Sequence, residues 1–200
     1  MDAARKVKRK LKEIVVICVC GLAGSGKSTA AKRLAEKYGF RYYSGGDALM
    51  ALALKKGYKA LNGGWWESQE GLRFLGQRGK DQAFDKLVDN ELLRQARKGN
   101  VILDSWTMPW LLKGGFKIWL ETSQKKRAER IVKRDRISEK EALQALMKKE
   151  RETRIIYRKL YHFTLGEDFE PFDLILDTEE LDAEEVFQTL CLVLDRVPLA

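Results

Sequence analysis

The stretch Gly21-Leu22-Ala23-Gly24-Ser25-Gly26-Lys27-Ser28 has the G-x-x-x-x-G-K-S spacing of a phosphate-binding loop. The apolar run 14–20 before it predicts a buried parallel strand, and residues 29–37 after it are mostly helix formers. A glycine-rich turn between a strand and a helix directs backbone N–H groups at a polyphosphate, at the positive end of the helix. In this context the stretch predicts a nucleotide site rather than a chance glycine-rich loop.

Each polar side chain of this loop has an expected task. Lys27 is expected to reach the β- and γ-phosphates, and the Ser28 hydroxyl to hold Mg²⁺. Asp104 ends the apolar run 101–103 and is expected to orient the same Mg²⁺, although it could instead cap the next turn. The expected cofactors are therefore ATP and Mg²⁺. The residues expected to bind ATP in the loop are Gly21, Leu22, Ala23, Gly24, Ser25, Gly26, Lys27, Ser28 and Thr29.

Length and composition favour a single soluble α/β domain. The chain has 200 residues, and none of its apolar runs reaches the ~18 residues of a membrane span. We see no secretory signal, and the three cysteines favour buried thiols in a reducing compartment. We therefore expect a cytoplasmic protein without a membrane partner.

The net charge of +9 is concentrated in two segments. Residues 1–12 hold six basic residues and are expected to form a basic arm, whereas residues 125–159 hold fourteen basic and six acidic residues. A basic face can bind nucleic acid, surround nucleotide phosphates, or belong to solvated helices. Because no aromatic-interleaved RNA module is present, nucleic acid is the less favoured partner.

Strand-like and helical segments alternate along the chain. Strands are expected at 13–20, 40–43, 101–104, 117–120 and 172–177. Helices are expected at 29–37, at 48–56, at 67–97 with a break near 76–80, at 123–134, and after the capping boxes that begin at Ser138 and Asp182. This alternation predicts a five-stranded parallel sheet that is covered by helices on both faces.

From about residue 13 onward the chain resembles the archaeal-type cytidylate kinases, which are adenylate-kinase-like nucleoside monophosphate kinases. The resemblance is carried by 21–29, Tyr43-Ser44-Gly45-Gly46-Asp47, 96–103, Lys117-Ile118-Trp119-Leu120, 127–131, Lys133-Arg134, 157–161 and 172–178.

The resemblance implies a P-loop NTPase fold and transfer of the ATP γ-phosphoryl to CMP or dCMP. It implies one kinase domain at 13–200, with an acceptor-binding insertion at about 45–98 and a lid at about 127–158. Arg130, Arg134, Arg151 and Arg154 are the lid candidates that would stabilise charge on the transferred group, and Arg127 could lie near the adenine. We expect a monomer or a weak dimer that acts on a small-molecule acceptor.

The acceptor residues depart from the family pattern. Met50 and Ser105-Trp106 stand where the family places arginines that would hold an acceptor phosphate. Asp47 could bind the substrate, act as a base on a hydroxyl, or cap the helix that begins at Ala48. The tryptophans of this region could stack on a base or fill a core. The candidate acceptor set is Ser44, Asp47, Met50, Trp65, Trp66 and Trp106.

Three functions follow from these observations. The first is phosphorylation of CMP or dCMP. The second is phosphorylation of a hydroxyl on a nucleoside or other small molecule, which would not require the missing arginines. The third is a nucleotide-dependent protein that contacts RNA or ribosomes through its basic segments.

Overall fold

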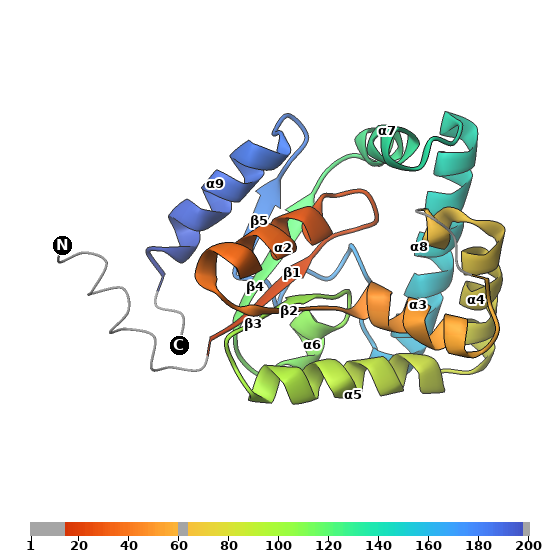
Figure 1. Cartoon of the computed structure of the whole chain (residues 1–200), viewed down its shortest axis with the longest axis horizontal. Helices are drawn as coiled ribbons and strands as arrows, with labels where there is room; N and C mark the ends of the chain where they lie inside the picture. The colour runs from red at the N-terminus through yellow and green to blue at the C-terminus, as the bar shows by residue number, and fades with distance from the viewer. Residues whose placement is uncertain (1–14, 60–63, 198–200) are drawn as a thin grey trace.

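The computed structural model describes residues 15–59 and 64–197, so the expected basic arm at 1–12 lies outside the described residues. Five strands form one sheet in the order β2-β3-β1-β4-β5 (Figure 1). Every neighbouring pair is parallel, which confirms the expected sheet. The strands are β1 (Val16–Cys20), β2 (Arg41–Ser44), β3 (Val101–Asp104), β4 (Phe116–Glu121) and β5 (Leu174–Asp177).

The order of the strands places two functional segments side by side. β1 is the central strand, and Val19 near its carboxyl end is in register with Asp104 at the end of β3. The loop that follows β1 therefore begins beside the Asp104 carboxylate. Ligands of open parallel sheets collect at this edge.

Helices cover both faces of the sheet. The helices α2 (Lys27–Tyr38) and α9 (Ala183–Leu194) lie on one face, and α3 (Gly45–Lys55), α5 (Ala83–Arg97) and the short α6 (Met108–Leu111) lie on the other (Figure 1). One cluster of buried apolar side chains lies beneath each of these two helical layers. The apolar strand residues thus pack against helices on both sides, as buried parallel strands require.

The remaining helices gather beyond one side of the sheet, at the right of Figure 1. They are the 3₁₀ turn η1 (Trp65–Glu67), α4 (Gln69–Lys80), α7 (Gln124–Asp135) and α8 (Glu139–Tyr161). The helix α8 packs against α7, α4 and η1. The segments η1 and α4, which precede β3 in the sequence, therefore pack against α8, which follows β4.

Local capping signals set several helix ends as expected. Both capping boxes are present, with Ser138 capping α8 and Asp182 capping α9, and Gly39 ends α2 with a positive φ of 65°.

Three details differ from the sequence-based expectation. Ser44 accepts a hydrogen bond from the Asp47 N–H (3.1 Å), so α3 starts at Gly45 and Asp47 is not its cap. The break expected near 76–80 lies at Asp81-Gln82, because Asp81 accepts from the Ala83 N–H (3.0 Å) and the glycines before it continue α4. The helix α6 was not expected.

Candidate active site

The loop between β1 and α2 needs glycine at two positions because other backbone approaches it closely. A Cβ on Gly21 would lie 2.6 Å from the Leu120 carbonyl oxygen, and one on Gly24 would lie 2.7 Å from that of Arg127. Both residues have positive φ, at 146° and 83°. The helix begins at Lys27, so its first N–H groups open toward the loop. The chain is therefore shaped as a cradle for phosphates.

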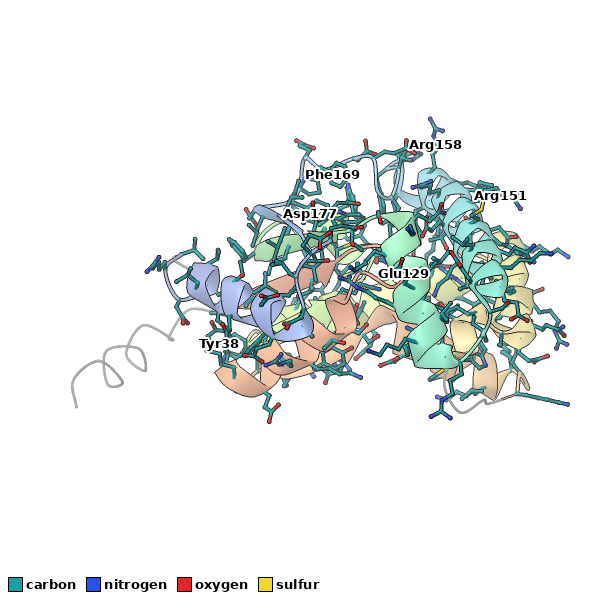
Figure 2. All side chains as sticks on the ribbon, turned by 90° about the horizontal axis from the view of Figure 1, so that it is seen from above. Tyr38, Glu129, Arg151, Arg158, Phe169 and Asp177 are labelled. Carbon is teal, nitrogen blue, oxygen red and sulfur yellow. The ribbon has the colours of Figure 1, made fainter. Side chains whose placement is uncertain are left out.

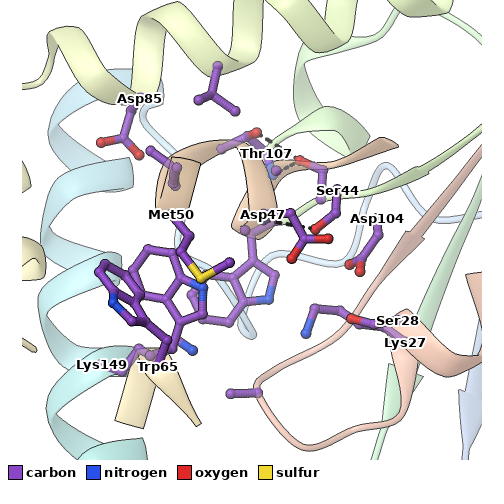
Figure 3. Close-up of a pocket in the computed structure, with 18 of the residues that line it drawn as sticks. Lys27, Ser28, Ser44, Asp47, Met50, Trp65, Asp85, Asp104, Thr107 and Lys149 are labelled. Atoms are coloured by element: carbon purple, nitrogen blue, oxygen red, sulfur yellow. Dashed lines mark hydrogen bonds between the residues drawn. The ribbon is translucent and has the colours of Figure 1, made fainter. Parts of the chain in front are cut away.

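A cavity of about 490 Å³ extends from this loop toward α5 and α8 (Figure 3). Its size suits a small-molecule ligand. The predicted residues that line it are Ala23, Gly24, Lys27, Ser28, Ser44, Asp47, Met50, Trp65, Trp66, Asp104, Trp106 and Arg134. Residues from five separated segments therefore meet at one site.

The end of the cavity beside the loop is polar. Figure 3 shows Lys27 and Ser28 on α2 facing Asp104 and Asp47. Asp104 is 3% exposed and accepts a hydrogen bond from the Tyr42 hydroxyl (3.0 Å). Lys27 makes no ion pair with another described residue, which leaves its ammonium available to a phosphate.

The chemistry of these groups fits Mg²⁺. No cluster of three or more His, Cys, Asp or Glu side chains that could hold a metal occurs within residues 15–59 and 64–197. Mg²⁺ in kinases is usually bound through one or two protein oxygens together with substrate phosphates and waters. The Ser28 hydroxyl and the Asp104 carboxylate supply such oxygens, and Mg²⁺ would neutralise charge on the phosphates there.

Trp106 forms a wall between the loop and the rest of the cavity. Its indole N–H donates to the Gly21 carbonyl oxygen (2.6 Å), and the Lys27 ammonium lies 5.6 Å from its ring centroid. The ring is therefore fixed against the loop. Because residue 106 is a tryptophan and not an arginine, this position supplies no cation to the cavity.

Trp65 and Trp66 extend this apolar wall. Their rings are nearly perpendicular, at 85°, with centroids 4.9 Å apart. Trp65 is only 4% exposed and donates to the Lys59 carbonyl oxygen (2.9 Å), so it is part of the core as well as a lining residue.

The far end of the cavity contains charged side chains that sequence reasoning missed. Arg78 and Asp85 form an ion pair in which each side chain is 2% exposed, with Nε and Oδ2 3.2 Å apart. Asp89 accepts hydrogen bonds from the Thr107 hydroxyl (2.6 Å) and the Tyr161 hydroxyl (2.5 Å). Burial raises the pKa of Asp89 to about 6, against the lowering effect of these hydrogen bonds. The floor of the cavity therefore offers both donors and acceptors.

The signal for these residues is present in the sequence. Asp85 and Asp89 are one helical turn apart, and they alternate with the buried Phe84 and Val88 on the same side of α5. Lys149 occupies a buried position of α8, after Leu146 and before Thr153. A charged residue within a buried stripe is a candidate for a functional site.

Two cations from the helices α7 and α8 reach the cavity. The Arg134 guanidinium lies 3.0 Å from the Glu67 carboxylate, and it also pairs with Asp135. The Lys149 ammonium lies 3.2 Å from the other oxygen of Glu67 (Figure 3 shows its position). Burial lowers the pKa of Lys149, and the Glu67 carboxylate opposes this effect.

The other lid candidates do not line the cavity. Arg127 is buried against Glu150 and donates to the Ala23 carbonyl oxygen (3.2 Å), so it joins α7 and α8 to the loop rather than lying open to an adenine. Arg130 donates to the Thr178 carbonyl oxygen (2.7 Å) and to that of Ser25 (3.3 Å).

Arg154 and Arg151 are also directed elsewhere. Arg154 donates to the Leu165 carbonyl oxygen (2.8 Å). Arg151 is exposed at the outer side of α8, as Figure 2 shows. Two residues turn an α-helix by about 200°, so Arg151 cannot share the side of α8 that Lys149 presents to the cavity.

Comparison with known proteins identifies the family of the chain. The model of the cytidylate kinase-like family matches residues 16–180. The chain is 33% identical to a cytidylate kinase of Ignicoccus hospitalis over 88% of this chain and 97% of that one. It is 32% identical to a cytidylate kinase of Pyrococcus horikoshii over 93% of this chain and 91% of that one.

Solved structures share the fold at lower sequence identity. A shikimate kinase from Bacteroides thetaiotaomicron has a TM-score of 0.57 and 17% identity, and covers 92% of this chain and 99% of its own. A deoxyadenosine kinase from M. mycoides has a TM-score of 0.52 and 17% identity, over 90% of this chain and all of its own. The described helices include none that combines the length and apolar character needed to cross a membrane.

The phosphate cradle, the cavity beside it and the match over residues 16–180 lead to one conclusion. The chain belongs to the cytidylate kinase-like family and is an ATP-dependent kinase with a P-loop fold.

Proposed function

We propose that this kinase transfers the γ-phosphoryl group of ATP to CMP or dCMP, giving CDP or dCDP. The observation that carries the proposal is the cavity, which runs from the phosphate cradle at Lys27 to the polar floor at Arg78 and Asp85. A nucleoside monophosphate has the same polarity, with a phosphate at one end and a base at the other. The curated relatives named cytidylate kinase give the proposal independent support.

The floor of the cavity suits cytosine. Cytosine presents an amino donor next to a ring-nitrogen acceptor and a carbonyl acceptor, whereas uracil presents a carbonyl in place of the amino group. The carboxylates of Asp85 and Asp89 can accept from the amino group, and the Arg78 guanidinium can donate to the acceptors. A uracil carbonyl would instead face a carboxylate and could not donate to it. The floor of the cavity should therefore favour cytosine over uracil.

At the other end, the chain's own groups would align the reacting phosphates. Lys27 and the loop N–H groups would hold the β- and γ-phosphates, and Ser28 and Asp104 would hold Mg²⁺. An oxygen of the acceptor phosphate attacks the γ-phosphorus, and the bond to the β–γ bridging oxygen breaks to release ADP. Lys149 and Arg134 would balance charge on the transferred group and, with the tryptophan wall, exclude water.

A nucleoside hydroxyl is the second candidate acceptor. Met50 and Trp106 line the cavity without supplying a guanidinium, and a nucleoside would need none there. A hydroxyl acceptor must lose a proton as it attacks phosphorus, and the Asp47 carboxylate faces the reacting end to receive it (Figure 3). A phosphate acceptor requires no such base.

A screen of acceptors tests the proposal. ADP release should be measured by a coupled assay with CMP, dCMP, UMP, AMP and cytidine at equal concentrations. We expect CMP and dCMP to give the highest kcat/KM, and UMP to be at least about tenfold poorer because of the unpaired carbonyl. Faster turnover of cytidine than of CMP would replace the first candidate with the second, and Asp47→Asn should then abolish the activity.

A further inference from the structure

Glu67 holds both lid cations of the cavity at once. It is the last residue of η1, directly after the two tryptophans, and its side chain is only 5% exposed. One carboxylate oxygen lies 3.2 Å from the Lys149 ammonium on α8, and the other lies 3.0 Å from the Arg134 guanidinium on α7. A single carboxylate therefore connects the acceptor side of the cavity to both helices of the expected lid.

Lys149 lies over aromatic faces, and both lid cations already have carboxylate partners. The Lys149 ammonium is 5.1 Å from the Trp66 ring centroid and 5.6 Å from that of Trp106. Arg134 has a second carboxylate partner in Asp135, whose side chain is 3% exposed. Two cations thus face two carboxylates. The Arg134 side chain is 55% exposed, whereas the other three side chains are at most 11% exposed, and charges in such poorly solvated surroundings interact strongly.

Positive and negative side chains are also equal in number over the whole lining of the cavity. It contains five cationic and five carboxylate side chains. The cations are Lys27, Lys32, Arg78, Arg134 and Lys149, and the carboxylates are Asp47, Glu67, Asp85, Asp89 and Asp104. Arg78 is committed to Asp85, and Lys27 and Lys32 lie at the ATP end. An acceptor phosphate would therefore have to share the lid cations with Glu67.

We propose that Glu67 is a specificity-determining residue that acts as an internal counter-ion in the position of the acceptor's phosphate. It weakens binding of acceptors that carry a phosphate, relative to the nucleoside with the same base. This inference rests on the proposed function only in taking cytosine as the base of the acceptor. Its physical basis, competition between a carboxylate and a phosphate for Lys149 and Arg134, applies to any anionic acceptor.

The test compares Glu67→Gln with two controls. The glutamine keeps the size of the side chain and removes its charge. Glu67→Asp keeps the charge, and Glu91→Gln removes a carboxylate from an exposed pair with Arg94 that does not line the cavity. Thermal unfolding of each protein should be recorded first, so that binding is compared only among folded samples.

Binding is measured with the P-loop filled by AMP-PNP and Mg²⁺, using the fluorescence of the tryptophans beside Lys149. Inorganic phosphate, CMP and cytidine are titrated separately. We expect Glu67→Gln to bind phosphate and CMP about tenfold more tightly than the wild type while its affinity for cytidine changes less than about twofold. Glu67→Asp and Glu91→Gln should retain the wild-type ratio of CMP affinity to cytidine affinity.

Two results would overturn the inference. One is an unchanged ratio of CMP to cytidine affinity in Glu67→Gln. The other is weaker binding of phosphate and CMP, because Glu67 would then orient the cations for the acceptor instead of competing with it. If Glu67→Gln does not fold, the inference requires Glu67→Asp to keep the wild-type ratio, and a changed ratio there counts against it.

Failure of the proposed function has a different signature. In that case neither the wild type nor any variant turns over CMP, dCMP or cytidine. The titration with inorganic phosphate still decides whether Glu67 competes with an anion, because it does not depend on the base.

Discussion

The two ends of the cavity are built in different ways. At the end proposed to bind ATP, the backbone of one continuous segment, 21–29, forms the site, and glycines allow its close approach to β4 and α7. At the acceptor end, side chains from η1, α4, α5, α7 and α8 form the site by pairing with one another. A backbone site leaves little room for change, whereas a site made of paired side chains can be altered one charge at a time. We therefore expect substitutions to alter the acceptor end more readily than the P-loop.

The ATP end should show the largest effect of a single substitution. We expect Lys27→Ala to lower kcat by about a thousandfold or more, because an unpaired cation beside the transferred group is lost. Steady-state ADP release with CMP measures the loss. Lys37→Ala is the matched control, since Lys37 lies at the other end of α2 in an exposed pair with Asp195 and should keep wild-type activity. Comparable activity of the two variants would remove Lys27 from the mechanism.

The floor of the acceptor end should control stability as well as binding. We expect Arg78→Met to destabilise the fold by about 4 kcal/mol, because it leaves the Asp85 carboxylate buried without its partner. Chemical denaturation measures this change, and Arg94→Met in an exposed pair on α5 should leave the midpoint close to the wild type.

A double variant separates the two roles of that pair. Arg78→Met combined with Asp85→Leu removes both charges and should recover most of the lost stability. It should still bind CMP poorly, since the donors and acceptors for the base are gone. Recovery of stability together with wild-type CMP affinity would show that the pair is purely structural.

Asp89 should make stability depend on pH. Burial raises the pKa of Asp89 to about 6, so the folded chain keeps this proton at pH values where the unfolded chain has released it. The unfolded state therefore binds fewer protons between about pH 4 and pH 6, and stability falls as pH rises through this window.

The loss is on the order of 2 to 3 kcal/mol and is complete above the folded pKa. Denaturation of wild type and Asp89→Asn at pH 4, 5, 6 and 7 measures it, and the variant should lack this component of the slope. Parallel pH profiles for the two proteins would show that Asp89 does not titrate in this range.

The smallest effects are expected for arginines of the lid helices α7 and α8. Arg134→Ala should lower kcat/KM with CMP about tenfold, because it removes a cation from the cavity. Arg151→Ala should change the same value less than about twofold, since its side chain is exposed on α8 away from the cavity (Figure 2). Equal losses in both variants would mean that α8 rotates or moves during the reaction.

The sequence alone predicted much of this molecule because the relevant signals are local. The G-x-x-x-x-G-K-S spacing, the alternation of apolar strands with helices, and the capping boxes at Ser138 and Asp182 each depend on residues a few positions apart. The family resemblance also followed from short segments in the correct order, and the family match confirms it. The end of α4 was misplaced because a local cap at Asp81 outweighed the glycines before it.

Only the tertiary structure decided which charged side chains meet at the acceptor end. Glu67 and Lys149 are 82 residues apart, and the Arg78–Asp85 pair is buried through the packing of separate helices. Of the arginines at 127–154, the fold directs Arg134 into the cavity and uses the others for contacts elsewhere or leaves them exposed. The physical reason is that helical phase and packing set the direction of a side chain, while residue type and spacing determine only that a basic helix is present.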